Sequence, residues 1–321
     1  MADLPTGQHA PPDGVKETPV IILESDRGLT PRKIAGFLGT AALVIALPVI
    51  FTVAIGIYQT LRPEKIVSAA TPKDHGLAYE DAVIRTADGI DLAAWYVPAK
   101  KPSGAAVLVL HGYPADKGDV LPRTAFLAED HDLLYIDFRW LGRSGGSYTT
   151  GGPKEVLDAD AALGYLRAKG IKKIGIYGFS MGGSVALMTL GRPTPPDAVV
   201  AEAAYGDLRS IMSEQYRYLG PLKPLCTWLT GLFAKAALGI DLDRESPAAV
   251  VAGTKAPVLL IHSRKDKVVP FEHAEMLRNG LSSDPAAEFW FMDDVGHGEP
   301  TADFVPRIRT FFNTHLKPAT Q

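Results

Sequence analysis

The chain has 321 residues, of which 46% are hydrophobic and 21% charged, enough to bury the core of one large domain or two smaller ones. The net charge is −3 and no block of Lys and Arg stands out, which argues against a nucleic-acid-binding surface. The single cysteine, Cys226, excludes an intramolecular disulfide. No zinc-type spacing, P-loop or dinucleotide-binding turn occurs, so we expect neither a metal nor an organic cofactor.

An apolar segment follows a polar N-terminal tail. Residues 1–33 are rich in Pro, Gly and Asp and are predicted to be disordered. The segment from Ile34 to Tyr58 carries no charge, and as a helix it is about 37 Å long, enough to cross a hydrocarbon core of about 30 Å. Thr30-Pro31 suits a helix start. We expect a transmembrane anchor; the alternative, a cleaved signal peptide, has a shorter apolar region.

The charges on either side of this segment indicate its orientation. Lys16, Arg27, Arg32 and Lys33 precede it, whereas Arg62, Lys65 and Lys73 follow it. This narrow excess favours a cytoplasmic N-terminus, so the rest of the chain is expected outside the cytoplasm. Residues 59–76 form a polar linker.

Strand and helix patterns alternate after the linker. Residues 86–99 predict a hairpin that turns at Asp88-Gly89. Short apolar runs suited to strands buried on both faces follow at 105–110, 133–138, 173–179, 198–203, 257–263 and 288–294. Helical patterns lie at 153–170, 180–191, 270–280 and 301–316. The chain is therefore predicted to be an α/β protein with a mostly parallel sheet and helices on both faces.

Two serines occupy a G-x-S-x-G pattern, Ser144 and Ser180. A nucleophilic serine in this pattern needs a strand before it and a helix after it, with small residues where the two crowd together. Ser180 has all three features, since KIGIY precedes it, GGSVALMTL follows, and Gly178 and Gly182 provide the space. Ser144 is followed by a loop. We therefore predict Ser180 as the nucleophile.

A serine nucleophile needs a base and an acid that orients the base. His297, in the loop DDVGHGEP after the last apolar run, is the predicted base, whereas His262, His273 and His315 lie in a strand or in helices. Asp266, just past the strand PVLLIHS, is the predicted acid, and Asp207 is the alternative. Asp293 and Asp294 are expected only to mark a turn. The backbone N–H groups of Tyr113 and Met181 are expected to form an oxyanion hole.

These motifs together resemble the α/β-hydrolase superfamily over about Leu77 to Leu316. The resemblance lies in LVLHGYP, IDFRWLGRSGGS, IYGFSMGG, PVLLIHSRKDKVVP and DDVGHGEP, and it is greatest to single-span, membrane-anchored serine hydrolases of the Bem46-like and serine-aminopeptidase-like groups. It implies a triad of Ser180, Asp266 and His297 and a loop role for Ser144. The chain departs from the family pattern at Trp140, expected to place a bulky group near the site rim, and at Ser263.

The resemblance places a hydrolase domain at residues 77–321, with a small cap at about 205–256. Six cap residues recur at helical spacing and are expected to pack in a core: Leu225, Trp228, Leu229, Leu232, Phe233 and Ala236. The alternative is that they line an acyl pocket or face the bilayer.

The predicted function is hydrolysis of carboxylic esters, with small acyl esters or lipid-derived molecules as substrates. A thioesterase or a peptidase remains an alternative; a peptidase needs charged groups to hold a substrate terminus, for which Glu202, Asp207, Arg209 and Glu214 are candidates. A membrane-anchored binding protein without activity is the alternative outside enzymes.

Overall fold

The structure is a computed structural model that describes residues 30–317. Of the predicted disordered tail, residues 1–33, residues 1–29 lie outside the described residues, and residues 31–33 form the start of a helix, so the expectation of disorder is wrong for them. The chain divides into two compact units, residues 1–48 and 49–321. Helix α1, Pro31–Leu61, contains the whole predicted span and extends it by three residues at each end. Within residues 30–317 it is the one helix long and apolar enough to cross a membrane.

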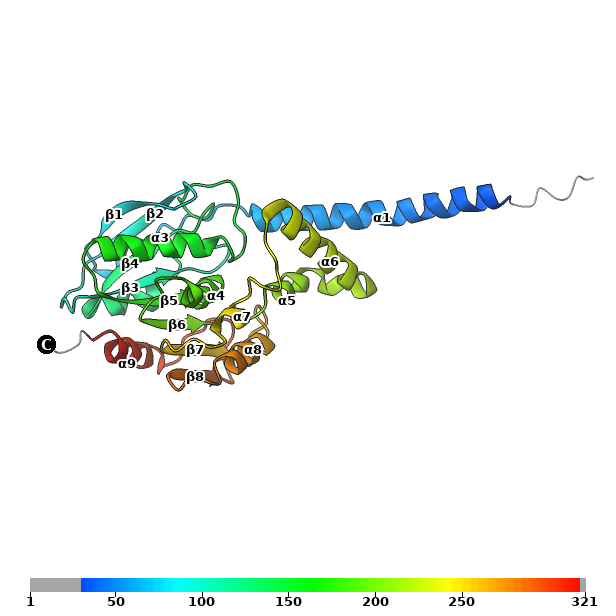
Figure 1. The fold of residues 1–321 in the computed structure, drawn as a ribbon. Helices are drawn as coiled ribbons and strands as arrows, with labels where there is room; N and C mark the ends of the chain where they lie inside the picture. Colours follow the sequence, from blue (N-terminus) through cyan, green and yellow to red (C-terminus); the bar gives the residue numbers. More distant parts are fainter. Residues whose placement is uncertain (1–29, 318–321) are drawn as a thin grey trace, which may run out of the picture. The chain divides into compact units, whose positions relative to one another are not determined.

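An eight-stranded sheet forms the centre of the second unit, in the order β1-β2-β4-β3-β5-β6-β7-β8 (Figure 1). The antiparallel strands are β1 (Glu80–Arg85) and β2 (Asp91–Val97), and β2 pairs antiparallel with β4. The parallel strands are β3 (Ala105–Leu110), β4 (Asp132–Ile136), β5 (Lys173–Phe179), β6 (Ala198–Glu202), β7 (Val258–Ser263) and β8 (Ala287–Met292). All six apolar runs are thus confirmed as strands, each to within two residues.

Helices cover both faces of this sheet (Figure 1). The main helices outside the β6–β7 connection are α2 (Leu121–Thr124), α3 (Glu155–Ala168), α4 (Met181–Met188), α8 (Glu272–Gly280) and α9 (Phe304–His315), with short helices η1 (Pro72–His75), η2 (Ala125–Glu129) and η3 (Thr189–Gly191). One core cluster joins α3, α4 and α8 to the sheet, and the other joins α2 and α9 to the opposite face. Strand β3 shows why the runs are continuously apolar, because Leu108 faces the first cluster and Val109 the second, and both are fully buried. The predicted sheet with helices on both faces is confirmed.

A helical insertion connects β6 to β7. It contains α5 (Leu208–Ser213), η4 (Glu214–Leu222), α6 (Lys223–Phe233), η5 (Ala234–Leu238) and α7 (Pro247–Val251). The last turns of α1 belong to the same unit and pack against this insertion. Val53 and Ile57 of α1 share a buried cluster with Tyr216 and Cys226.

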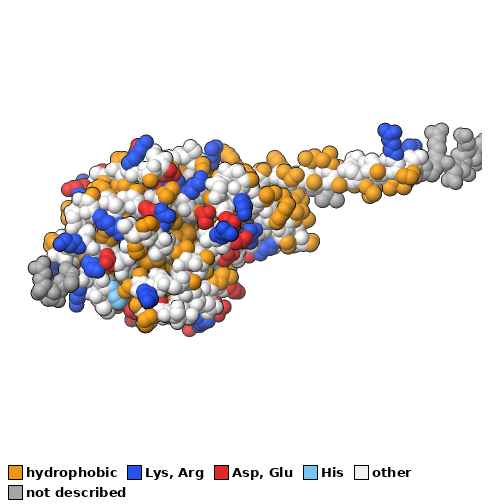
Figure 2. All heavy atoms as spheres, in the orientation of Figure 1, with side chains coloured by type: hydrophobic (Ala, Val, Ile, Leu, Met, Phe, Trp, Pro, Cys, Tyr) orange, Lys and Arg blue, Asp and Glu red, His pale blue; other side chains and the backbone are white. Residues whose placement is uncertain are grey.

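Most apolar residues of the predicted stripe do not pack in a core as expected, although Leu229 is partly buried against the cluster that α6 shares with α1. Leu225, Trp228, Leu232 and Phe233 are 44%, 58%, 52% and 38% exposed. The buried face of α6 consists instead of the small residues Cys226, Thr230 and Gly231. Helical spacing identifies an apolar stripe but not the face that meets a neighbour, and here close approach selects the small side chains. Figure 2 shows hydrophobic atoms gathered over the insertion beside the end of α1.

Candidate active site

Ser180 lies in a strained turn between strand β5 and helix α4. Its φ and ψ are 54° and −118°, a conformation that costs free energy for a residue with a side chain. A Cβ at Gly178 would lie 2.2 Å from the Gly182 carbonyl oxygen, and one at Gly182 would lie 2.4 Å from that of Leu110. Only glycine fits these positions. The Ser180 N–H donates to the Glu202 carbonyl at 2.8 Å, which fastens the turn to the end of β6.

Three predicted side chains meet at the carboxyl ends of the parallel strands. His297 Nε2 lies 3.2 Å from Ser180 Oγ, and His297 Nδ1 lies 2.7 Å from Asp266 Oδ2. The other oxygen of Asp266, Oδ1, accepts from the N–H groups of Val268 and Val269 at 2.8 and 2.9 Å. With Nδ1–H donating to the carboxylate, Nε2 is free to accept a proton from the serine.

The environment of Asp266 keeps its carboxyl ionised. Burial of the side chain raises its pKa, but the hydrogen bond from His297 and those from Val269 and Val268 lower it more, so that the pKa lies below its ordinary value. A negative charge beside Nδ1 then stabilises the imidazolium that forms when His297 takes a proton.

The rejected candidates make other contacts. Asp207, the alternative acid, caps α5 by accepting from Ser210 N–H at 2.6 Å. His262, buried in β7, lies 2.9 Å from the Val269 carbonyl and 3.6 Å from Asp266, whereas the contact with Ser180 comes from His297. His315 lies 3.9 Å from Glu288. The two aspartates before His297 pair with surface cations: Asp293 with Arg264 and Asp294 with Lys265.

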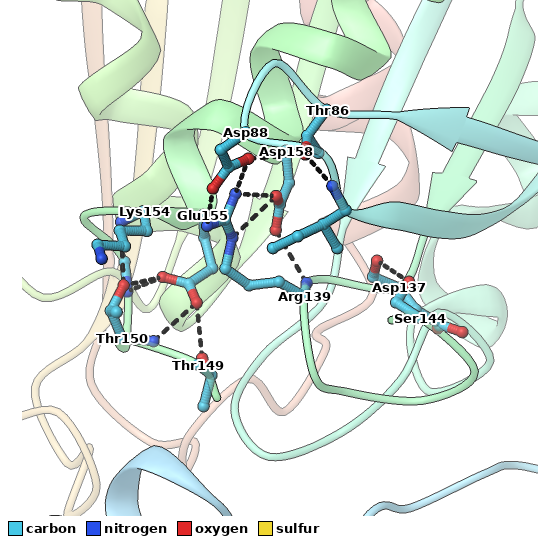
Figure 3. Close-up of polar contacts among 12 residues, drawn as sticks. Thr86, Asp88, Asp137, Arg139, Ser144, Thr149, Thr150, Lys154, Glu155 and Asp158 are labelled. Carbon is cyan, nitrogen blue, oxygen red and sulfur yellow. Dashed lines mark hydrogen bonds and ion pairs between the residues drawn. The ribbon is translucent and has the colours of Figure 1, made fainter. Parts of the chain in front are cut away.

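Ser144 belongs to a buried structural cluster. Its hydroxyl donates to the Asp137 carbonyl at 2.7 Å and accepts from Ala93 N–H at 2.9 Å. Beside it, Arg139 reaches both Asp158 on α3 and Asp88 in the β1–β2 turn (Figure 3). These contacts fasten the loop after β4 to its neighbours and occupy both hydrogen-bonding functions of the Ser144 hydroxyl.

The loop after β3 approaches Ser180. A Cβ at Gly112 would lie 3.3 Å from the Ser180 Cβ, so Tyr113 follows directly beside the serine. His111 holds this loop, since its Nε2 accepts from Phe138 N–H at 3.0 Å. Burial lowers the pKa of His111, which favours the neutral ring that this hydrogen bond requires. Met181, the other predicted donor, is the first residue of α4.

A cavity of about 350 Å³ opens at Ser180. Its apolar lining includes Met181, Tyr205, Leu208, Ile211, Met212, Val268 and Val269, and its polar lining includes Glu214, Gln215 and Arg217. Thr60, from the last turn of α1, also lines it, a contribution that sequence reasoning missed. The α6 stripe does not line this cavity, so it does not form an acyl pocket at Ser180; the alternative that it faces the bilayer stays a prediction.

The two departures from the family pattern have structural roles. The indole N–H of Trp140 donates to the Pro63 carbonyl at 3.1 Å, and the side chain does not line the cavity, so the expectation of a bulky group at the site rim is wrong. The Ser263 hydroxyl donates to the Val295 carbonyl and thereby ties β7 to the loop that carries His297.

A buried ion pair that sequence reasoning missed also holds the His297 loop. Arg123 of α2 pairs with Glu202 at 2.9 Å and donates to the Gly298 carbonyl at 2.8 Å. Tyr177 donates to the other oxygen of Glu202. The Arg123 guanidinium lies 4.3 Å from the centre of the Phe179 ring, and the centre of that ring lies 5.1 Å from the centre of the His297 ring. No local motif marks these residues, because they are far apart in sequence.

A mostly parallel sheet with a strained serine between β5 and α4, and a histidine and an aspartate at the same edge, defines an α/β-hydrolase. Residues 140–318 match the model of the prolyl oligopeptidase family, more than half of the chain, and the protein belongs to this family. The resemblance to the superfamily is thereby confirmed.

Several known proteins are similar over most of their length. The uncharacterized protein YqkD of Bacillus subtilis is 29% identical, over 73% of this chain and 81% of that protein. The lysophosphatidylserine lipase ABHD12 of Danio rerio is 26% identical, over 73% of this chain and 69% of the lipase. The crystal structure of the Pyrococcus furiosus esterase Pf2001 is 28% identical and superposes with a TM-score of 0.66, over 80% of this chain and 98% of the esterase.

Proposed function

We propose that the protein is a serine hydrolase that cleaves carboxylic esters. The observation that carries the proposal is the continuous chain of contacts from Ser180 through His297 to Asp266. The similarity to an esterase and to a lysophosphatidylserine lipase supports esters as the substrate class.

The reaction follows from the geometry. Ser180 Oγ attacks the ester carbonyl while His297 Nε2 takes its proton, and the carbonyl oxygen becomes an oxyanion held by the N–H groups of Tyr113 and Met181. Collapse of this intermediate breaks the bond to the alcohol, which leaves with the proton from His297. Water, activated by the same imidazole, then attacks the acyl-enzyme and releases the acid and free Ser180.

The insertion at about 205–256 acts as a cap over the acyl group in this proposal. The cavity walls are mainly apolar, so an acyl chain gains free energy on entering in proportion to the apolar area it buries. Lipid-derived esters suit such a cavity. Among the described residues, Glu214 is the one carboxylate in the cavity lining, and its pairing with Lys223 at 2.7 Å makes it less available to hold the amino terminus of a peptide.

The apolar helix α1 serves as a membrane anchor in the same proposal. Its last turns bury Val53 and Ile57 against the insertion, and Thr60 lines the cavity. Removal of α1 as a signal peptide would expose this packing and open a wall of the cavity, whereas retention keeps both. The flanking charges favour a cytoplasmic N-terminus and a hydrolase domain outside the cytoplasm.

A fluorophosphonate probe tests the proposed nucleophile. We expect the probe to label the wild type and the Ser144→Ala variant, which shares the sequence pattern, but not Ser180→Ala. Hydrolysis of matched esters, thioesters and aminoacyl amides then identifies the substrate class, and Ser180→Ala should lower ester turnover by about 10⁴-fold or more. An unlabelled wild type would favour a binding protein, and faster cleavage of the amides than of the esters would favour a peptidase.

A further inference from the structure

A second depression lies between the end of α1 and the insertion, separate from the cavity at Ser180. It is a groove of about 590 Å³, within the range of about 300–1,000 Å³ typical of small-molecule sites. Its lining residues are Ile50, Val53, Ala54, Ile57, Tyr58, Leu61 and Arg62 of the α1 end, with Tyr148, Leu229, Phe233 and Leu238. None of these residues lines the cavity at Ser180.

We propose that this groove binds a phospholipid of the membrane, with an acyl chain between α1 and α6 and the phosphate at Arg62.

The position of the groove along α1 favours a lipid. A hydrocarbon core of about 30 Å takes about 20 helical residues, so a span that begins at Ile34 leaves the core near Val53. The groove extends from Ile50 to Arg62 and therefore crosses the boundary between acyl chains and headgroups. A phospholipid at this depth has its acyl chain beside the apolar residues of the groove and its headgroup beside Arg62.

The chemistry of the lining also matches a phospholipid. Among residues 30–317, Arg62, at the polar end, is the one charged residue in the lining, and it has no carboxylate partner within 4.0 Å. A guanidinium binds phosphate oxygens through paired hydrogen bonds. Tyr58 and Tyr148 add phenol groups near this end, a residue type enriched at membrane interfaces.

The exposed face of α6 extends the apolar surface beyond the groove. Leu225, Trp228 and Leu232 face away from the core and expose about half of their surface. A helix packed against the membrane-exit turns of α1 would place these side chains at the bilayer surface. The bilayer therefore covers the face of α6 and supplies the lipid in the groove.

This inference rests on the proposed anchorage of α1, and the experiment separates the two. The full-length protein is released in mild detergent from vesicles of phosphatidylglycerol and phosphatidylcholine, and retained lipid is measured by native mass spectrometry. We expect the wild type to retain lipid. Ala54→Trp, which fills the groove, should retain about 10-fold less lipid per protein molecule than the wild type. The matched control Ala249→Trp, an exposed position on α7 outside the groove and outside the α6 stripe, should retain lipid as the wild type does. The wild type should retain phosphatidylglycerol in preference to phosphatidylcholine, and Arg62→Gln should lose this preference.

Two measurements keep the result interpretable. Resistance to carbonate extraction reports anchorage, and the circular dichroism melting curve reports folding. Lipid loss in Ala54→Trp with both measurements unchanged supports the site. Equal lipid retention by Ala54→Trp and the wild type, or no lipid on an anchored, folded wild type, would overturn it. A chain extracted by carbonate would refute the anchorage itself, and the groove site with it.

Discussion

At the residue scale, the ion pair of Arg123 and Glu202 links the two loops on which the proposed chemistry depends. The Glu202 backbone holds Ser180, and its side chain holds Arg123, which in turn holds the carbonyl next to His297. Both side chains are largely buried, at 17% and 2% exposure. The pair therefore acts as a positioning device that sets the distance between the serine and the imidazole.

Replacement of Arg123 tests this positioning role. We expect Arg123→Gln to lower kcat by about 10–100-fold with little change in KM, because the cavity lining does not include Arg123 but the imidazole shifts. The variant also leaves Glu202 buried without its cation, at a cost of about 3–5 kcal/mol in the free energy of unfolding.

A double variant distinguishes the effect of the ion pair on the position of His297 from its effect on the stability of the fold. Arg123→Gln combined with Glu202→Gln removes the unpaired charge and should recover much of the stability, yet kcat should stay low because the contact with Gly298 is still lost. Recovery of kcat together with the melting temperature would show that the pair only stabilises the fold.

At the element scale, the last turn of α1 contributes directly to the cavity at Ser180. The Thr60 hydroxyl lies 3.1 Å from Gln215 Oε1, and the Tyr113 hydroxyl donates to the Thr60 carbonyl at 3.2 Å. Helix α1, the helical insertion and the predicted oxyanion loop therefore meet at one wall of the cavity. Substrate preference should depend on a residue of α1.

A larger side chain at Thr60 tests this dependence. Thr60→Trp should reduce kcat/KM for long-chain esters by about 10-fold or more relative to short-chain esters, because it removes volume from the acyl site. Thr52→Trp, an exposed position on the same helix, is the matched control. Trp228→Ala should leave the chain-length profile unchanged, since Trp228 is exposed and does not line the cavity. Identical profiles for both α1 variants would contradict the assignment.

At the scale of the whole molecule, buried histidines couple folding to pH. Burial lowers the pKa of His111, His131, His262 and His273, so the folded protein keeps these rings neutral. The unfolded chain binds protons at these rings below about pH 6.5. Because the unfolded state then carries more protons than the folded state, the free energy of unfolding decreases as the pH falls below about 6.5.

Replacement of His131 tests this coupling between folding and pH. His131 is buried and lies 2.9 Å from Asn313 Oδ1. Each such proton contributes a slope of up to about 1.4 kcal/mol per pH unit between its two pKa values. Below about pH 6.5, the free energy of unfolding of His131→Gln, measured with denaturant in detergent, should change less steeply with pH than that of the wild type. An unchanged slope would show that His131 does not contribute.

The sequence alone determined the six apolar strands, the strand–turn–helix setting of Ser180 and the loops that carry Asp266 and His297, whereas β1 lies before the predicted hairpin and the order of the strands in the sheet was not predicted. Apolar runs report burial on both faces, and strand–turn–helix spacing distinguished Ser180 from Ser144, since both signals are local. The long apolar helix α1 was predicted for the same reason, because its apolar composition is also a local signal.

Only the tertiary structure decided which distant residues meet. Most of the stripe on α6 is exposed, the Trp140 indole contacts the linker, and Thr60 lines the cavity, none of which spacing along the chain could indicate. The contact of Arg123 with Gly298 joins residues separated by 175 positions. Sequence periodicity specifies the faces of an element, whereas the partner of each face depends on how all the elements pack together.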